Sequence, residues 1–569
     1  MRLRMGFVVI AMVLSVFGAR LVQLQGVDPN SYAAMAAAEG LVEVDLPAER
    51  GDILDRNGKA LADSVDGLMI VADPLMTAEK APEIARFLYR ELDVDYAATL
   101  NRLREEGSRY EYIARRVPAT QANAVIAAAE KLKFKGLYTQ HDPLRDYPVG
   151  DVAANLVGFL GTDEPLAGLE RTFDDQLSGT DGSARYEVGA GKKIPLGENT
   201  VTDPVDGQDL QTTIDLDLQW YTQRVLRQTV QQWGADSGLA VVMDSQTGEL
   251  LALADHPTFD ANHPTESPKA DLGSRAMQDV YEPGSVEKVL TLSSLIDLGL
   301  VTPRTQIVVP PSLQREDSPI GDWFDHGTIR LTLAGVLAKS SNIGTVLAAD
   351  HFKSGQLHEY LTRFGLGQRT AIGVRGETEG LLPAAGVWTH QQQDRIAFGQ
   401  SLSVNGVQMA AAINTIANGG VRVSPSLIMG SVTTDEGDVV GTDTTTERRV
   451  ISEDAARQTA LMMERVVDEK VGVAPGAAVP GYRVAGKTGT AQAVGADCAC
   501  YDGTFDVSFA GFAPADDPRF TVYVVVKNPD TGGGGSVAGP AFSKIMSYTL
   551  KRYAVPPTGT RPSRLPVEW

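Results

Sequence analysis

Ser285-Val286-Glu287-Lys288 lies near the middle of the chain and is its only serine followed by a lysine three residues later. A serine hydroxyl becomes a good nucleophile only when a neighbouring base removes its proton, and a lysine does so when burial and nearby cations suppress its charge. Residues i and i+3 share one helix face, so Ser285 and Lys288 are expected to meet. Pro283-Gly284 precede them and the apolar run 289–300 follows, which predicts that Ser285 opens a buried helix near its positive N-terminal end.

Two further short motifs follow in order, Ser340-Ser341-Asn342 and Lys487-Thr488-Gly489-Thr490. Each motif alone has an ordinary structural interpretation: a serine-lysine pair is usually a solvated helix face, Ser-Ser-Asn a helix cap and Lys-Thr-Gly a turn. All three in this order, in compatible local structure, indicate a serine site for acyl transfer.

Length and charge limit the class of protein. A chain of 569 residues is too long for one ordinary core and predicts two or three domains. Hydrophobic residues make up 43% of the chain, which is ample for packed cores. The net charge of -21 argues against binding to nucleic acid, because phosphate contacts need clustered Lys and Arg.

The N-terminus is either a signal peptide or a membrane anchor. Arg2 and Arg4 precede an uncharged run, 5–19, and Arg20 stands within the apolar stretch that continues it. A cleavage site needs small residues in an A-x-A pattern, and here a large ring occupies the first of those positions. Spanning takes about 20 residues and an arginine near the end can snorkel, so we expect an uncleaved, single-pass anchor in 1–25. By the positive-inside bias its N-terminus is cytoplasmic, and the bulk of the chain then lies outside the membrane.

The chain has 2 cysteines, Cys498 and Cys500, which are separated only by Ala499. A structural zinc site needs a second pair of ligands, and none of the 7 histidines lies close in sequence, so we expect no metal. A disulfide across one residue closes a small strained ring, although a compartment outside the membrane permits it. Free thiols and a disulfide therefore stay as equal alternatives.

The segment from about 48 to 217 contains no nucleophile motif, phosphate loop or metal-ligand spacing, and is expected to be a mixed scaffold. Its Asn57-Gly58 pair, flanked by charges, predicts a hairpin turn. Alanine and leucine recur at helical spacing in 81–92 and 119–132, which predicts two helices.

Strands are expected at both ends of the remaining chain. Two apolar runs, 239–244 and 250–254, are separated by turn residues and predict a hairpin. A second strand-rich region lies much later, and the middle, 290–417, is largely helical in character. This arrangement predicts one antiparallel sheet closed by distant pieces, a helical lobe beside it and a cleft at their junction. The later strands are expected at 483–487, 506–512 and 520–526, followed by a helix at 541–553 that packs on the sheet.

With these motifs in place, the chain resembles the class B penicillin-binding proteins over nearly its whole length. The resemblance rests on motifs beyond the three above: Tyr281-Glu282-Pro283-Gly284-Ser285, Arg50-Gly51 with Asp55-Arg56-Asn57-Gly58, and Gly168-Leu169-Glu170 with Phe173-Asp174 and 177–179. Three stretches resemble the division-specific FtsI group more than the elongation group: Arg20-Leu21-Val22-Gln23-Leu24, the Tyr-Glu-Pro-Gly-Ser run 281–285 and Phe398-Gly399-Gln400. Ser341 stands where β-lactamases often carry Asp, a variation that class B proteins accept, and the loop with Cys498 and Cys500 resembles that of actinobacterial members.

The resemblance implies an α+β protein in four parts. These are a cytoplasmic stub and transmembrane helix in 1–25, an elongated mixed α/β pedestal of the dimerisation type in 26–217, a penicillin-recognising serine transpeptidase domain with an antiparallel sheet and a helical lobe in 218–555, and a Pro-rich tail in 556–569.

The resemblance also implies a reaction on peptidoglycan stem peptides that end in D-Ala-D-Ala. Ser285 is expected to attack the penultimate D-Ala carbonyl while Lys288 takes its proton. Ser340 relays a proton to the leaving amine, and Asn342 holds Lys288 or the substrate amide. No cofactor is expected, and β-lactams are expected to acylate Ser285.

The third motif is expected to bind substrate. Lys487 supplies positive charge, Thr488 and Thr490 supply hydroxyls for the terminal carboxylate, and Gly489 lets the strand approach the peptide closely. The backbone N–H groups of Ser285 and Thr490 are expected to form the oxyanion hole.

Other functions of serine acyl-transfer proteins require sequence features that differ from those of this chain. A β-lactamase needs no anchor or pedestal, a β-lactam sensor needs an inner signalling domain, and a bifunctional class A enzyme needs a Glu-Asp-x-x-Phe motif that the chain lacks before Ser285. A divisome scaffold with a vestigial site conflicts with the intact motifs. A D,D-carboxypeptidase differs only in using water as acyl acceptor, and an elongation-type transpeptidase only in its place of action, so both stay open. By resemblance, the expected partners are the membrane, a glycan polymerase of the SEDS family and other divisome proteins at the septum.

Overall fold

The computed structural model of the chain describes residues 2–22, 41–161, 164–189, 192–193, 199–315, 318–495 and 500–569. Cys498, Leu24 and the end of the expected anchor lie outside these residues. The chain divides into two compact units that are interleaved in sequence. Unit 1 comprises Met1–Gly51, Ser64–Leu144 and Ser178–Gln208, and unit 2 comprises Asp52–Asp63, Arg145–Leu177 and Asp209–Trp569.

The first helix, α1 (Arg2–Val22), begins where the anchor was expected. Among the described residues, none of the helices is both long and apolar enough to cross a membrane.

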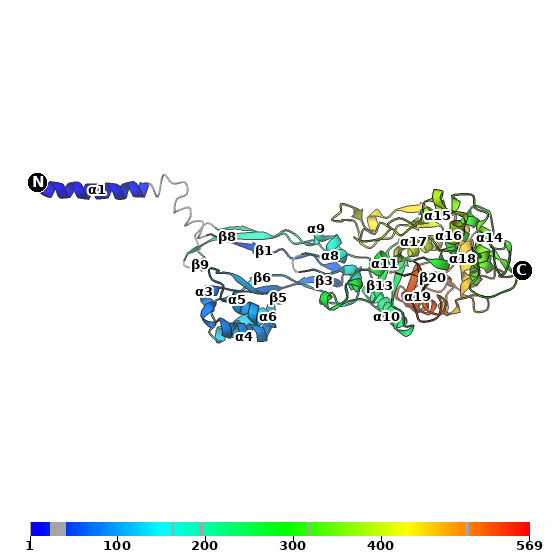
Figure 1. Cartoon of the computed structure of the whole chain (residues 1–569), viewed down its shortest axis with the longest axis horizontal. Helices are drawn as coiled ribbons and strands as arrows, with labels where there is room; N and C mark the ends of the chain where they lie inside the picture. The colour runs from blue at the N-terminus through cyan, green and yellow to red at the C-terminus, as the bar shows by residue number, and fades with distance from the viewer. Residues whose placement is uncertain are drawn as a thin grey trace. The chain divides into compact units, whose positions relative to one another are not determined.

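Unit 1 contains two small sheets. The first has the order β1-β8-β10 with β9 paired to β8, and the second the order β5-β4-β6. The strands are β1 (Leu41–Leu46), β4 (Gly67–Ala72), β5 (Glu111–Pro118), β6 (Leu137–His141), β8 (Gly182–Gly189), β9 (Lys192–Lys193) and β10 (Thr200–Thr202). The helices beside the second sheet are α3 (Pro74–Thr77), α4 (Ala81–Leu92), α5 (Tyr96–Arg102) and α6 (Ala119–Lys131) (Figure 1).

The second sheet of unit 1 and its helices share a separate hydrophobic core. Ile84 and Leu88 lie one turn apart on α4 and are buried, as the helical spacing predicts. Asp93 ends α4 in the left-handed conformation, and its N–H donates to the carbonyl oxygen of Tyr89. The predicted helices at 81–92 and 119–132 are therefore confirmed, the second ending one residue earlier, at Lys131.

Unit 2 is built on a five-stranded sheet with the order β13-β12-β22-β21-β20. Its strands are β12 (Ser237–Asp244), β13 (Leu250–His256), β20 (Ala485–Val494), β21 (Tyr501–Ala513) and β22 (Phe520–Lys527). All four pairings are antiparallel, so the predicted hairpin and the sheet closed by distant pieces are confirmed. β20 differs from the prediction of a strand at 483–487, because it begins at Ala485 and carries the Lys-Thr-Gly motif in its first half.

Helices cover both sides of this sheet, since every residue of β22 except the last is buried. The long helix α10 (Leu216–Gln232) and α19 (Ala538–Arg552) contact each other and lie against the sheet, and α17 (Gly406–Ala417) also packs on β12 and β22 (Figure 1). Phe542 of α19 packs against Phe509 of β21 with ring centroids 4.7 Å apart. The final helix thus packs on the sheet as predicted, starting three residues earlier than expected.

The helical lobe of unit 2 carries the remaining motifs. Its helices are α11 (Arg275–Gln278), α12 (Lys288–Asp297), α13 (Leu333–Lys339), α14 (Asn342–Ala349), α15 (Gln356–Phe364), α16 (His390–Ala397) and α18 (Glu453–Val467). Three short helices precede α10: α7 (Ala154–Val157), α8 (Gly168–Thr172) and α9 (Asp174–Leu177). The short strands are β2 (Ile53–Leu54), β3 (Ala60–Val65), β7 (Leu144–Asp146), β11 (Leu210–Gln211), β14 (Gln306–Val309), β15 (Ile329–Thr332), β16 (Val421–Val423), β17 (Val432–Thr433), β18 (Val439–Val440) and β19 (Glu447–Arg449).

Candidate functional site

Ser285 lies in a 3₁₀ turn, Gly284–Val286, directly before α12. The prediction that Ser285 opens the helix is corrected in this detail, because the α-helix begins at Lys288. Gly284 has φ +54°, and a Cβ there would lie 2.9 Å from the carbonyl oxygen of Thr490. The turn therefore needs glycine, because β20 passes too closely for a side chain.

Lys288 is fully buried at the start of α12, and its Nζ contacts the second motif. Nζ lies 2.8 Å from the carbonyl oxygen of Ser340, 2.6 Å from Oδ1 of Asn342 and 3.4 Å from Oγ of Ser340. Burial lowers the pKa of Lys288 to about 7, and the negative charge of Asp322 opposes that effect. A large share of Lys288 is thus neutral near neutral pH.

Ser340 lies between two helices. It follows α13 with φ +59°, and Ser341 then caps α14 by accepting a hydrogen bond from the N–H of Gly344 at 2.8 Å. A left-handed serine costs about 1–3 kcal/mol and is typical of functional sites. The tight connection turns both Ser340 and Asn342 toward Lys288.

Lys487 is also fully buried and approaches Ser340 from β20. Its Nζ lies 2.8 Å from Oγ of Ser340, 2.9 Å from the carbonyl oxygen of Thr488 and 3.1 Å from Oγ1 of Thr488. Burial, and then the charge of Lys288, lower the pKa of Lys487 well below its usual range. Ser340 Oγ therefore lies within contact distance of both lysines.

A cavity of about 800 Å³ lies above the two lysines. Of the eight residues predicted for the site, five line it: Ser285, Ser340, Asn342, Thr488 and Thr490. Lys288 and Lys487 lie beneath it and reach it through Ser340. Gly489 belongs to the same strand, and a Cβ there would lie 2.2 Å from Oγ of Ser508. Ser285 and Thr490, the residues expected to provide the oxyanion N–H groups, both line this cavity.

Asp322 was not found from the sequence. Its Oδ2 accepts a hydrogen bond from Oγ of Ser341 at 2.7 Å, and its Oδ1 accepts one from the N–H of Ile343 at 3.0 Å. His326 Nε2 lies 3.1 Å from the same carboxylate. The side chain of Asp322 is completely buried, so the loop that carries it is fastened to the N-terminus of α14.

Other cavity residues also escaped the sequence analysis. The run Gly532-Gly533-Gly534-Gly535 lines the cavity, and a Cβ at Gly534 would lie 2.2 Å from the carbonyl oxygen of Ser508. Four consecutive glycines are visible in the sequence and are a usable signal for close backbone approach. Trp323, Arg395 and Phe505, which also line the cavity, belong to no short motif.

Cys500 takes part in a disulfide. The next residue, Tyr501, donates from its hydroxyl to both carboxylate oxygens of Glu282, at 3.0 and 3.1 Å. Glu282 also accepts a hydrogen bond from the N–H of Ser401 at 2.8 Å. The start of β21 is thus linked to the stretch that leads into Ser285.

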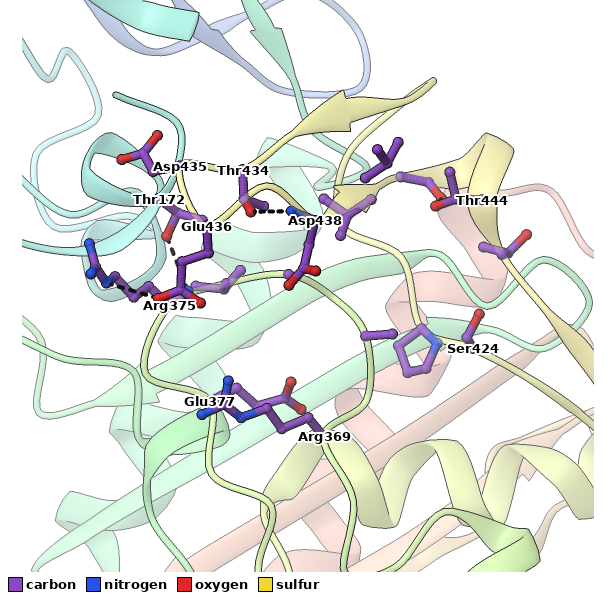
Figure 2. Close-up of a pocket in the computed structure, with 18 of the residues that line it drawn as sticks. Thr172, Arg369, Arg375, Glu377, Ser424, Thr434, Asp435, Glu436, Asp438 and Thr444 are labelled. Atoms are coloured by element: carbon purple, nitrogen blue, oxygen red, sulfur yellow. Dashed lines mark hydrogen bonds and ion pairs between the residues drawn. The ribbon is translucent and has the colours of Figure 1, made fainter. Parts of the chain in front are cut away.

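A second cavity, of about 350 Å³, shares no lining residue with the first. Figure 2 shows Arg375 beside Glu436, and Glu377 beside Arg369, across its interior. Arg375 Nε lies 3.3 Å from Oε1 of Glu436. Asp435, which also lines this cavity, lies near Asp174 and Asp175, and burial together with these carboxylates raises its pKa.

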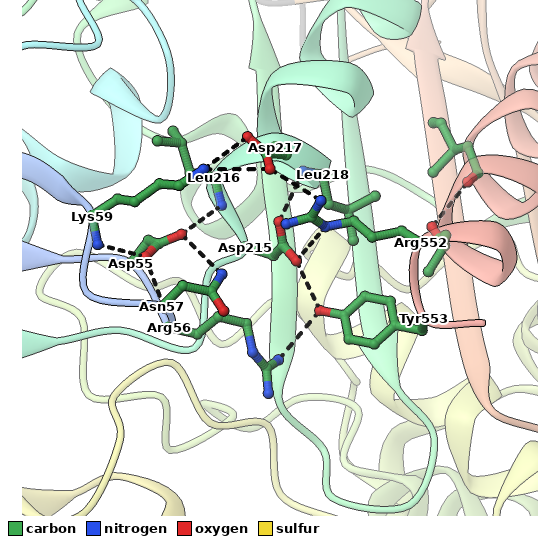
Figure 3. Close-up of polar contacts among 12 residues, drawn as sticks. Asp55, Arg56, Asn57, Lys59, Asp215, Leu216, Asp217, Leu218, Arg552 and Tyr553 are labelled. Carbon is green, nitrogen blue, oxygen red and sulfur yellow. Dashed lines mark hydrogen bonds and ion pairs between the residues drawn. The ribbon is translucent and has the colours of Figure 1, made fainter. Parts of the chain in front are cut away.

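The motif Asp55-Arg56-Asn57-Gly58 lies in unit 2, against the start of α10 and the end of α19 (Figure 3). Asp55 accepts hydrogen bonds from the N–H groups of Asn57 and Lys59, both at 2.8 Å, so the predicted turn is stabilised by its own aspartate. Asp215 caps α10 and accepts from Nε of Arg552 at 2.6 Å. This cluster is a structural connection and holds no nucleophile.

Two family models match parts of this chain. Residues 238–547 match the model of the penicillin-binding protein transpeptidase domain, and residues 45–165 match that of the penicillin-binding protein dimerisation domain.

Relatives cover almost the whole chain. It is 35% identical to penicillin-binding protein PbpB of Mycolicibacterium smegmatis, over 98% of this chain and 91% of the relative. It is 32% identical to peptidoglycan D,D-transpeptidase FtsI of Escherichia coli, over 95% of this chain and 89% of the relative. Among solved structures, penicillin-binding protein 3 of Mycobacterium tuberculosis complexed with aztreonam superposes with a TM-score of 0.71 at 30% identity, covering 92% of this chain and all of that one.

Proposed function

This chain belongs to the class B penicillin-binding proteins and is a transpeptidase of that family, and on this basis we propose that it crosslinks peptidoglycan stem peptides in septal wall synthesis. The substrates are stem peptides that end in D-Ala-D-Ala, and β-lactams acylate the same serine. The observation that carries the proposal is the contact set of Lys288 Nζ, which leaves this amine suited to take a proton from Ser285.

The hydrogen bonds of Lys288 support its role as the base that accepts the proton of Ser285. A neutral amine has two N–H donors and one lone pair, and Lys288 has two short contacts to acceptors, the Ser340 carbonyl and Asn342 Oδ1. Its lone pair is then available for the hydroxyl proton of Ser285, one turn earlier in the chain. Ser285 Oγ attacks the penultimate D-Ala carbonyl, an ester forms, and the bond to the terminal D-Ala breaks.

Proton delivery to the leaving amine runs through Ser340. Ser340 Oγ lies 3.4 Å from Nζ of Lys288 and 2.8 Å from Nζ of Lys487. Ser340 passes its hydroxyl proton to the departing D-Ala amine and takes in return the proton that Lys288 removed from Ser285, while Lys487 holds the Ser340 oxygen in place. A stem-peptide amine then attacks the ester and releases Ser285. Asn342 keeps Lys288 in place during both steps.

Recognition of the substrate falls to the strand β20. Thr488 and Thr490 line the cavity, and their hydroxyls suit the terminal carboxylate of the peptide. Lys487 supports this strand by contacting the carbonyl oxygen and Oγ1 of Thr488. Gly489 lets β20 pack closely on its neighbours, because a Cβ there would lie 2.2 Å from Oγ of Ser508 and 3.0 Å from the carbonyl oxygen of Pro283. The N–H groups of Ser285 and Thr490 receive the oxyanion, a device whose loss costs roughly 100- to 1000-fold in rate.

One assay tests the proposal. One sample of the purified protein is labelled with fluorescent penicillin. A second, unlabelled sample is incubated with a D-Ala-D-Ala stem peptide and an acceptor amine, and its products are analysed by mass spectrometry. A crosslinked product supports the transpeptidase. Release of D-Ala with hydrolysed peptide alone would instead identify a D,D-carboxypeptidase, and no labelling would remove the whole assignment.

Asp322→Asn is expected to make acylation less sensitive to acid. The carboxylate charge raises the pKa of Lys288, so its loss lowers that pKa below about 7 and keeps the base neutral at lower pH. Asn retains an oxygen for the N–H of Ile343 and an amide for Ser341. The acid limb of the rate of penicillin acylation is expected to move to lower pH. If the acid limb of the pH–rate profile stayed where it is in the parent protein, Asp322 would have no influence on the pKa of Lys288, and the prediction would be wrong.

The division into an anchor (1–25), pedestal (26–217), transpeptidase domain (218–555) and tail (556–569) is part of the proposal, as is a single-pass location with the bulk of the chain outside the cell membrane. The support for the anchor is its sequence, whose only charges in 1–25 are Arg2, Arg4 and Arg20. A glycan polymerase of the SEDS family and other divisome proteins are the proposed partners, because the chain contains no glycosyltransferase motif of its own.

Deleting residues 1–25 is expected to leave β-lactam acylation in solution nearly unchanged, since the site lies wholly in unit 2. The same deletion is expected to fail to restore septal growth in a depleted cell. Acylation is measured with fluorescent penicillin and division by microscopy. Restored division by the truncated protein would contradict the proposed anchor.

A further inference from the structure

Residues 555–569, here called the C-terminal strap, leave the end of α19 and contact three elements of unit 2. The hydroxyl of Tyr482 donates to the carbonyl oxygen of Val555 at 2.6 Å, and Arg483 Nη1 donates to Oγ1 of Thr560 at 2.7 Å. Tyr482 and Arg483 lie three and two residues before the start of β20. The first half of the strap is thus attached to the strand that carries Lys487.

The middle of the strap is attached to α18. The N–H of Ser563 donates to Oε2 of Glu464 at 3.1 Å, and Arg465 Nη1 donates to the carbonyl oxygen of Ser563 at 3.0 Å. Glu464 in turn accepts two hydrogen bonds from Arg483, at 2.6 and 3.1 Å. α18, the approach to β20 and the strap therefore share one largely buried polar cluster.

The last residues of the strap lie on the N-terminus of α13. The N–H of Thr332 donates to the carbonyl oxygen of Val567 at 3.0 Å, and Oγ1 of Thr332 donates to that of Pro566 at 2.5 Å. The same Oγ1 caps α13 by accepting from the N–H of Gly335 at 3.0 Å. Trp569 Nε1 donates to the carbonyl oxygen of Leu331 at 3.1 Å, and its ring lies under the guanidinium of Arg330.

The fit is close at Gly335. A Cβ at this position would lie 1.9 Å from the carbonyl oxygen of Val567, so only glycine admits the strap. Val567 is buried, and most of the contacts above are made to backbone atoms of the strap. The strap therefore occupies a defined position on α13.

These contacts join the two elements that meet at the active site. β20 carries Lys487 and α13 ends at Ser340, and the two side chains lie 2.8 Å apart. We propose that the C-terminal strap positions α13 against β20, so that Ser340 is held between Lys487 and Lys288, with Thr332, Gly335 and Val567 as its positioning residues. This inference rests on the proposed function, because it assigns the strap a part in the acylation step.

Removal of residues 563–569 tests the strap directly. The acylation rate constant is expected to fall about 10- to 100-fold, because a displacement of about 1 Å at a reacting centre has effects of that size. A synthetic peptide with the sequence of residues 563–569 is expected to restore the rate in a saturable manner, whereas a scrambled peptide has no effect. A normal rate without residues 563–569 would overturn the proposal, and so would failure of the peptide to rescue a folded, slowly acylated truncation.

Gly335→Ala provides a second test that removes nothing from the chain. Alanine is a better helix former than glycine, so α13 itself is not weakened, whereas the added Cβ displaces Val567. The variant is expected to reproduce the slow acylation of the truncation. Arg564→Ala, at an exposed strap residue, is the matched control and is expected to acylate normally. A Gly335→Ala variant as fast as this control would overturn the proposal.

The pH profile separates positioning from simple loss of stability. Lys288 faces Asp322, which contacts His326, on one side and Lys487 on the other, and its pKa is held near 7 by burial. A displaced α13 admits water, so the pKa of Lys288 rises and the acid limb of acylation moves to higher pH. A variant that is merely unstable has a smaller fraction of protein that can be labelled, but the acid limb of its acylation rate stays at the same pH. That result would count against the proposal. If the parent protein is labelled normally on Ser285 but the strap variants behave like it, only the strap proposal fails. If the parent protein is not labelled on Ser285, the proposed function itself fails.

Discussion

Ser285→Ala is expected to abolish covalent labelling by fluorescent penicillin. Ser285 is the serine that lines the cavity in the turn before α12, and alanine removes only its hydroxyl oxygen. The fold should be unaffected, because Ser285 is partly exposed and the turn is set by its neighbour Gly284. The measurements are gel fluorescence, intact-protein mass and the melting temperature.

The matched control is Ser312→Ala, at an exposed serine outside the cavity, which should label normally. Detection of a penicillin adduct on another residue of Ser285→Ala, with a normal melting temperature, would show that the nucleophile has been misassigned.

Lys288→Ala is expected to slow acylation by about 100- to 10,000-fold, the usual contribution of a general base. The loss has a second cause: without the amine, Asn342 Oδ1 and the Ser340 carbonyl oxygen lose their donor, although Nδ2 of Asn342 keeps its hydrogen bond to the carbonyl oxygen of Gly321. The second-order rate constant for penicillin acylation is measured between pH 5 and 10. In the parent protein the acylation rate should rise with pH as Lys288 loses its proton near pH 7, and this rise should be absent from Lys288→Ala.

Lys353→Ala, at an exposed lysine of the same unit, serves as control and should keep both the rate and the pH dependence. A Lys288→Ala protein that is acylated at a near-normal rate at neutral pH would place the base elsewhere, with Lys487 as the next group to test.

Local sequence signals predicted the elements that depend on local patterns. Helix spacing located α4 and α6, the alternation of turn and apolar residues located β12 and β13, and the three motifs identified all the residues that meet around Ser340. These features depend on residues a few positions apart, where side-chain periodicity and caps act.

The remaining features depend on contacts between distant residues, which one sequence does not display. Asp322 has no motif around it, and its role exists only because the N-terminus of α14 lies beside its loop. The strap was expected to be a Pro-rich tail and nothing more, yet its position depends on Thr332 and Gly335, more than two hundred residues earlier. Lys288 begins α12 because the close approach of β20 shapes the preceding turn.

The strand order has a consequence for the synthesis of the chain. β22 lies at the centre of the five-stranded sheet, but it is the last of the five strands to be made. Until Phe520–Lys527 emerges, β12 and β21 each present an unpaired edge, and such edges associate with other chains. Pairings such as that of Ser237 with Lys527 also span a long loop, which slows folding. The nascent unit 2 is therefore most vulnerable to aggregation before its central strand arrives.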